Sequence, residues 1–213
     1  MDEVIILSYW ILNYGLFYFG FNFDLFKVTM VSGFVHASVV SCLSCISLYC
    51  YGYDYNRENL FFEELVSKYS LYYFIIDSIL LLFDFNLIYI LHHFFAILII
   101  KTILDLGHGS SLLMLMLFLG EITNPFRLSK TMIYNYNKLT YNILNFIFSW
   151  SFLFIRCIVM SYFFYHIFYN YIIYLDIYDK YKLLTGLCLS LLGSYYWAYL
   201  IIKKKINNYY KED

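Results

Sequence analysis

The stretch that decides the fold is LIYILHHFFAILIIKTIL, residues 87–104. It carries a single formal charge, at Lys101, and its length fits the roughly 17–25 apolar residues that cross a bilayer as a helix. Six other apolar stretches flank it. They cover residues 4–20, 28–51, 69–83, 109–121, 142–166 and 183–202. We therefore expect an all-α, polytopic transmembrane helix bundle of about seven spans.

The composition of the whole chain predicts the same class. Hydrophobic residues make up 62% of the 213 residues and charged residues only 14%. A typical soluble domain is roughly 45–50% apolar and about 25% charged. So few charges cannot cover the surface of a soluble globule, which argues against a cytosolic enzyme, a disordered chain and a secreted disulfide scaffold. The net charge of −1 gives no basic surface for nucleic acid, so no nucleic-acid partner is expected.

The distribution of Lys and Arg over the loops predicts an orientation, because cytosolic loops carry the excess. A lumenal N-terminus places the larger group on the cytosolic side: Lys27, Arg127, Lys130, Lys138, Lys203, Lys204, Lys205 and Lys211. The smaller group is then lumenal: Arg57, Lys68, Lys180 and Lys182. The chain divides accordingly into an N-terminal helix and loop (1–27), six helices (28–202) and a short basic cytosolic tail (203–213). A signal peptide is not expected, because Asp2 and Glu3 precede the first span.

Ionisable residues within the spans indicate a site, because such groups are expensive at membrane depth. Asp77 lies in the middle of the third predicted span, and His92 and His93 lie early in the fourth. Adjacent helical residues point about 100° apart, so only one of the two histidines can face a site squarely. An aspartate beside an imidazole holds one ring nitrogen protonated and raises the basicity of the other. We predict catalytic roles for these three residues; a purely structural polar cluster is the alternative.

A second group of polar residues surrounds the single proline. Asn124 before Pro125 predicts a helix cap followed by a new helix, so the fifth span breaks just after Glu121. A broken helix at membrane depth lines a cavity or is buried in protein. Arg156, deep in the sixth span, is a counter-charge for Glu121 or for a lipid headgroup. A structural ion pair between Glu121 and Arg156 is the alternative.

Other polar residues have simpler interpretations. Lys101 and Asp105 are spaced to pair along one helix. His166 lies where a span leaves the membrane, and Asp84 lies beside a tight turn where it is exposed to water. No metal site is predicted.

Four blocks in order resemble the TLC domain proteins, the family that includes ceramide synthases and translocating-chain-associated membrane proteins. They are Val35–Ser41 with His36, Tyr73–Asp77, Leu91–His93 and Glu121–Phe126. Arg156 also stands where the plain TLC branch carries an arginine. After His93 the chain lacks the Ser-Tyr of the ceramide synthases, and it has Asn124 where they carry a carboxylate. The resemblance is therefore to the plain branch.

This resemblance implies that six helices enclose a lipid-accessible cavity. It implies a role in lipid homeostasis or trafficking, with acyl transfer through His92 or His93 oriented by Asp77. The lipid-binding residues would be Glu121, Asn124, Arg156 and His36. The partners would be membrane lipids, fatty acyl or sphingoid, with acyl-CoA as a candidate substrate, no cofactor, and a homodimer as a candidate assembly. The endoplasmic reticulum is favoured over the plasma membrane.

Several alternatives stay open at this stage. One is a non-enzymatic lipid sensor or cargo receptor of the endoplasmic reticulum, and another is a ceramide synthase-like N-acyltransferase. A di-iron desaturase is disfavoured, because the five histidines do not form the required boxes. A b-type haem held by His36 with His92 or His93 is the least favoured.

Overall fold

The computed structural model describes residues 2–84 and 87–209, and over these residues the chain forms helices and no β-strand. The elements are α1 (Asp2–Gly15), η1 (Leu16–Gly20), α2 (Leu25–Tyr51), α3 (Phe61–Asp84), α4 (Leu87–Leu106), α5 (Ser110–Glu121), α6 (Asn124–Ile133), α7 (Lys138–Phe152), η2 (Leu153–Val159), α8 (Met160–Asn170), η3 (Ile172–Tyr174) and α9 (Ile177–Tyr209).

The predicted all-α membrane bundle is confirmed. Six helical stretches are long and apolar enough to cross a membrane: Leu25–Tyr51, Phe61–Phe83, Leu87–Leu106, Ser110–Ile133, Lys138–Tyr174 and Ile177–Asn207. One more helix, α1 continued by the π-helical η1, precedes these six stretches in the sequence and brings the number of helices expected in the bundle to seven. The fifth of these stretches, Lys138–Tyr174, is continuous through α7, η2 and α8, and its centre is π-helical over Leu153–Val159.

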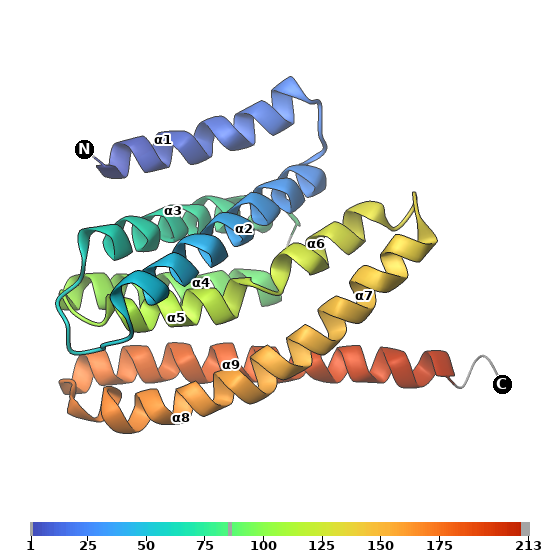
Figure 1. Ribbon diagram of the computed structural model, residues 1–213. Helices are drawn as coiled ribbons and strands as arrows, with labels where there is room; N and C mark the ends of the chain where they lie inside the picture. The colour runs from blue at the N-terminus through green and yellow to red at the C-terminus, as the bar shows by residue number, and fades with distance from the viewer. Residues whose placement is uncertain (1, 85–86, 210–213) are drawn as a thin grey trace.

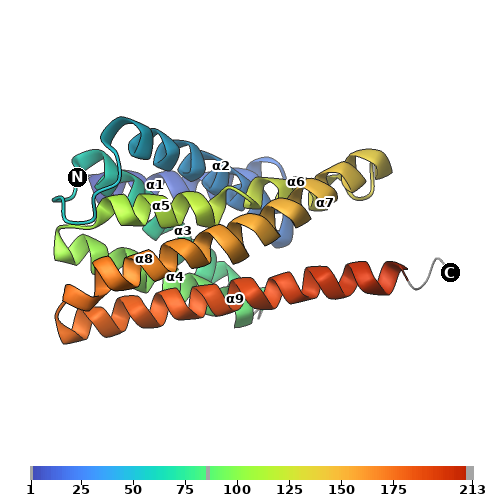
Figure 2. The same cartoon turned by 60° about the horizontal axis from the view of Figure 1, so that its bottom comes forward.

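The helices pack side by side with their ends gathered at two poles. Figures 1 and 2 show the α2–α3 and α4–α5 connections at one pole, and α6, the start of α7 and the C-terminal end of α9 at the other. Helix α2 packs on α3 and α5, and α4 packs on α3 and α9. At the start of α2, Asp24 accepts a hydrogen bond of 2.8 Å from the backbone N–H of Lys27, which lowers the pKa of the Asp24 carboxyl.

The first helix belongs to the bundle. Trp10 of α1 is fully buried, and its Nε1 donates to the backbone oxygen of Tyr69 on α3 at 3.0 Å. The Trp10 ring also packs on Tyr73, with 5.1 Å between ring centroids. A buried tryptophan that also satisfies its N–H is a strong anchor. Helix α1 is therefore fixed on α3.

The pole that carries the α2–α3 loop is closed by a polar clasp, which we define as Ser47, Arg57, Asn59, Glu63 and Ser110. The Glu63 carboxylate is fully buried. It accepts hydrogen bonds from the Arg57 guanidinium at 2.7 Å and from Ser47 at 2.8 Å, and a third from Ser110. Asn59 accepts from the backbone N–H of Ser110 at 2.9 Å, at the first residue of α5. The clasp thus joins α2, α3 and α5.

The structure corrects two predicted boundaries. The third span was predicted over 69–83 with a polar loop before it, but α3 begins at Phe61. The first turns of α3 stay packed in the bundle despite their charges, because the Glu63 carboxylate has its partners on neighbouring segments. The fifth span was predicted to be short. It does break after Glu121, and α6 then extends the same span to Ile133.

Candidate functional site

A cavity of about 380 Å³ lies in the half of the bundle away from the polar clasp. It is lined by the N-terminal half of α2, the C-terminal half of α3, the start of α4, and parts of α5, α6, α7, η2 and α9. Six of the predicted site residues line it together: Asp77, His92, His93, Glu121, Asn124 and Arg156. Its volume is in the range of small-molecule sites, roughly 300–1,000 Å³.

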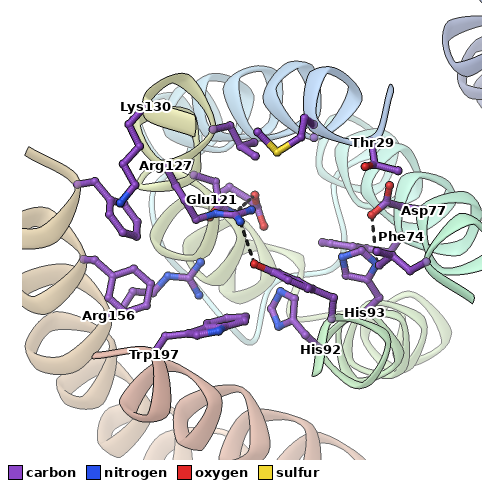
Figure 3. Close-up of a pocket in the computed structure, with 18 of the residues that line it drawn as sticks. Thr29, Phe74, Asp77, His92, His93, Glu121, Arg127, Lys130, Arg156 and Trp197 are labelled. Atoms are coloured by element: carbon purple, nitrogen blue, oxygen red, sulfur yellow. Dashed lines mark hydrogen bonds and ion pairs between the residues drawn. The ribbon is translucent and has the colours of Figure 1, made fainter. Parts of the chain in front are cut away.

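The closest pairing of a carboxylate with an imidazole in the cavity is between α3 and α4. Asp77 and His93 are both buried, and 3.6 Å separates the Asp77 Oδ2 from the His93 Nδ1 (Figure 3). The other oxygen of the carboxylate, Oδ1, accepts a hydrogen bond of 2.8 Å from the Tyr14 hydroxyl on α1. The Asp77 carboxylate therefore lies between a tyrosine and an imidazole, each on a different helix.

His92 has a different environment from its neighbour. Its ring lies edge-on to Trp197 of α9, with 5.7 Å between centroids, and edge-on to Phe74 of α3 at 6.4 Å. It lines the cavity without a carboxylate partner among the described residues. The sequence predicted that only one of the two histidines could face a site squarely, but both line the cavity. Their contacts differ in one respect: His93 faces the Asp77 carboxylate, and His92 faces Trp197.

Glu121 and Asn124 meet at the break between α5 and α6. The Asn124 Nδ2 donates to the Glu121 Oε2 at 2.8 Å. The predicted cap at Asn124 is therefore wrong: Thr123 is the residue that precedes α6, and Asn124 is its first helical residue. The asparagine side chain is used by the buried carboxylate and does not bond to the helix backbone, while Pro125 stands near the helix start as predicted.

His36 lies behind this break and does not line the cavity. It is fully buried and stacks on Tyr73, with 3.8 Å between ring centroids, and its Nδ1 is 3.9 Å from the Glu121 Oε2. His36 supports the wall that carries Glu121. Because His36 does not line the cavity, its position does not favour direct contact with lipid.

Arg156 enters the cavity from the π-helical segment η2. Its side chain is 4% exposed, and its guanidinium donates to the backbone oxygen of Gly120. It approaches the break beside Glu121, but the hydrogen bond goes to the neutral carbonyl and not to the carboxylate that was considered as its ion-pair partner. Single-turn π-helices inside α-helices are frequent at functional sites, where they redirect a side chain.

Sequence reasoning missed several residues of the site. Tyr14 was placed in a separate first span, and Arg127, Lys130 and Lys204 were counted as loop or tail residues. All three cations line the cavity. Arg127 and Lys130 are three residues apart, so they share one face of α6, and that spacing after Pro125 was the available signal. Figure 3 shows Arg127, Lys130 and Arg156 across the cavity from Asp77 and His93.

Lys101, Asp105 and His166 lie outside the cavity. Lys101 and Asp105 form the predicted pair along α4, at 3.2 Å, and both are exposed. His166 is exposed beside Tyr162. The side chain of Asp84 lies outside the described residues. Within the part of the chain that the structure describes, no cluster of His, Cys, Asp and Glu side chains could hold a metal ion.

Comparison with known proteins adds one finding. A family model described as the TLC domain matches residues 25–203, from the start of α2 to the last turns of α9. A comparison with curated proteins finds no match.

Proposed function

Because this chain belongs to the TLC domain family, we propose that it acts on membrane lipids and that its cavity transfers an acyl group to them. It is a multi-pass integral membrane protein. The proposal rests on one observation: a buried carboxylate, Asp77, facing an imidazole, His93, inside a cavity open to substrate.

The proposed chemistry is general base catalysis by His93. Asp77 holds the proton on Nδ1, which leaves Nε2 as the basic nitrogen. Nε2 takes the proton from a hydroxyl or amine of the acceptor lipid as that group attacks the acyl carbonyl. The protonated imidazole then returns the proton to the leaving group as its bond to the acyl carbon breaks. Catalysis of this kind contributes typically 10²–10⁴-fold to the rate.

The rest of the cavity suits a molecule with one apolar and one polar end. Phe74, Phe152 and Trp197 supply apolar surface, and Glu121 with Asn124 supplies hydrogen-bonding groups at the helix break.

The separation of 3.6 Å between Asp77 and His93 is longer than a hydrogen bond. Such distances commonly shorten when substrate binds, and we propose that they do so here.

The proposal includes location and orientation. We place the protein in the endoplasmic reticulum membrane, with the N-terminus lumenal and the basic C-terminal tail in the cytosol. The excess of Lys and Arg at the pole that carries α6 and the end of α9 supports the orientation.

A second candidate function is lipid binding without turnover, as in a sensor or cargo receptor. The same long distance between Asp77 and His93 favours it, because a histidine that never forms the hydrogen bond would not be a strong base. The two candidates share the cavity and differ in turnover alone.

The deciding experiment measures acyl transfer by the purified protein from acyl-CoA to lysolipid and sphingoid acceptors. We expect His93→Ala to abolish transfer and Asp77→Asn to lower its rate about a hundredfold. His166→Ala is the matched control, because this histidine is exposed outside the cavity. Equal rates in all variants would refute the role of His93. No transfer by the wild type, with a lipid that co-purifies in mass spectrometry, would establish the second candidate instead.

A further inference from the structure

We propose that the cavity binds the phosphate group of an amphipathic substrate through a cationic wall, defined as Arg127, Lys130, Arg156 and Lys204. The chemistry is shared by two sources, a phospholipid headgroup and the phosphates of an acyl carrier such as coenzyme A. The proposal deepens the proposed function, since it names the substrate class of the same site, but the binding itself requires no turnover.

The cations of this wall have neutral partners. Arg127 donates to the hydroxyl of Tyr89 at 3.0 Å, and Lys130 donates to the Oδ1 of Asn145 at 2.8 Å. Among the described residues, no carboxylate lies within ion-pair distance of any member of the wall. These cations do not serve to hold the fold together by ion pairing.

Arg156 makes the strongest case. Its side chain is 96% buried, being 4% exposed, and it lines the cavity. One terminal nitrogen donates to the Gly120 carbonyl, while its Nε has no hydrogen-bond partner in the described part of the chain. A buried charge with an unused donor is costly unless a charged group completes its surroundings. A ligand anion in the cavity is such a group.

Positive charge exceeds negative charge around the cavity. Two carboxylates line the cavity, Asp77 and Glu121, against the four cations of the wall. Asp77 faces His93 and Tyr14 on the opposite side, and Glu121 is bound by Asn124. The cavity therefore holds an excess of positive charge, and that excess lies on one wall (Figure 3).

Phosphate fits this wall better than a carboxylate does. The wall draws its members from three segments, α6, η2 and α9, so its donors approach from several directions. A phosphate offers more acceptor oxygens than a carboxylate, and guanidinium groups bind phosphate in a bidentate manner. A fatty acid carboxylate would leave part of this wall unused.

The exposure of the cations indicates how the ligand lies. Arg156 is buried, Arg127 and Lys130 are half-buried, and Lys204 is exposed. The wall therefore runs from the interior to the mouth of the cavity near the end of α9. A phosphate held there leaves the attached acyl group to extend across the cavity toward His93 (Figure 3).

The test measures binding to the detergent-solubilised protein by isothermal titration calorimetry with four soluble probes. They are dihexanoyl phosphatidic acid, unacylated coenzyme A, dihexanoylglycerol and hexanoate. We expect at least one phosphate-bearing probe to bind about tenfold or more tightly than both probes without phosphate, and its affinity to fall with added salt. Whichever of the first two binds identifies the source of the phosphate.

Variants show whether the wall is the binding surface. Lys130→Gln is expected to weaken the binding of the phosphate-bearing probe about tenfold. Lys204→Gln is compared with Lys205→Gln, its neighbour on α9, which lies over the ring of Trp150 and does not line the cavity. Only the first of these two is expected to weaken binding. The calorimetric readout requires no turnover, so a failure of acyl transfer does not affect this result.

Three results would overturn the proposal. One is binding of dihexanoylglycerol as tight as that of the phosphate-bearing probes. Another is binding of hexanoate as tight as theirs, which would assign the wall to carboxylates. The third is an equal loss in the Lys204→Gln and Lys205→Gln variants, which would reduce the effect to general surface charge.

Discussion

The two oxygens of the Asp77 carboxylate face different helices. Oδ1 accepts a hydrogen bond from Tyr14 on α1, and Oδ2 faces His93 on α4. A carboxylate held on one side is restricted in rotation, which fixes the direction of the oxygen that faces the imidazole. Tyr14 precedes the segment 25–203 that matches the family model, so the N-terminal helix contributes to the site from outside it.

Replacing Tyr14 tests this positioning role. We expect Tyr14→Phe to lower the kcat of acyl transfer about tenfold, because a hydrogen bond to a charged group contributes about 1.5–3 kcal/mol. KM should stay within a factor of about two, since the hydroxyl bonds to Asp77 and not to the lipid. Steady-state kinetics separate the two constants. The control is Tyr18→Phe, at an exposed position of η1. An unchanged kcat would show that Asp77 is oriented without Tyr14.

The polar clasp is expected to contribute to the stability of the bundle. Arg57→Ala leaves the buried Glu63 carboxylate without its cation and should lower the free energy of unfolding by about 3–5 kcal/mol. Lys68→Ala removes a partly exposed ion partner of Glu64 and should cost less than about 1 kcal/mol. Thermal unfolding in detergent compares the two. The double variant Arg57→Ala/Glu63→Gln should recover part of the lost free energy of unfolding, because it removes the unpaired charge. A double variant as unstable as Arg57→Ala alone would contradict this account.

At the scale of elements, α9 approaches α4 closely at one glycine. A Cβ added at Gly186 would lie 2.6 Å from the Ile99 Cγ1, whereas a Cβ at Gly193 would have no neighbour within 4 Å. Gly186→Ala should therefore destabilise the protein by about 1–3 kcal/mol through overpacking. Gly193→Ala should stabilise it by up to about 1 kcal/mol through helix propensity. Thermal unfolding of both variants checks the pair, and equal shifts would mean that α4 and α9 are not tightly packed there.

The sequence predicted the helices well and their ends poorly, for a physical reason. An apolar stretch such as 87–104 needs nothing but its own composition to be recognised as a span. The start of α3 depends on Glu63, whose charge is accommodated by Ser47 and Arg57 from other segments, and such partners are not visible in a local pattern. The predicted helix cap at Asn124 was wrong for a similar reason: the Asn124 side chain donates to the Glu121 carboxylate, a contact that the local sequence pattern does not show.

The same distinction applies to the candidate site. Ionisable residues in apolar spans are conspicuous, so Asp77, His92 and His93 could be selected from the sequence. That His93 and not His92 faces the Asp77 carboxylate depends on the rotation of α4 against α3. Arg127 was overlooked because its membership of the cavity depends on the direction of α6 after the break. The catalytic and lipid-binding roles themselves stay predictions.

At the scale of the whole molecule, the proposed orientation is directly testable. Acceptor tags for N-glycosylation at the two termini, expressed in microsomes, should be modified at the N-terminus and not at the C-terminus. The reason is the excess of Lys and Arg at the pole of α6 and the end of α9. A tag that is modified at the C-terminus alone would reverse the orientation and place the mouth of the cavity on the lumenal side.

The polar clasp has a consequence for what the bundle can do with a lipid. Ser47, Glu63 and Ser110 seal the pole opposite the cavity with hydrogen bonds that join α2, α3 and α5. The cavity is then closed at this pole, and a molecule that enters it leaves on the side from which it came. We expect the protein to handle lipids of one leaflet and to leave the exchange between leaflets, the work of a flippase, to other proteins.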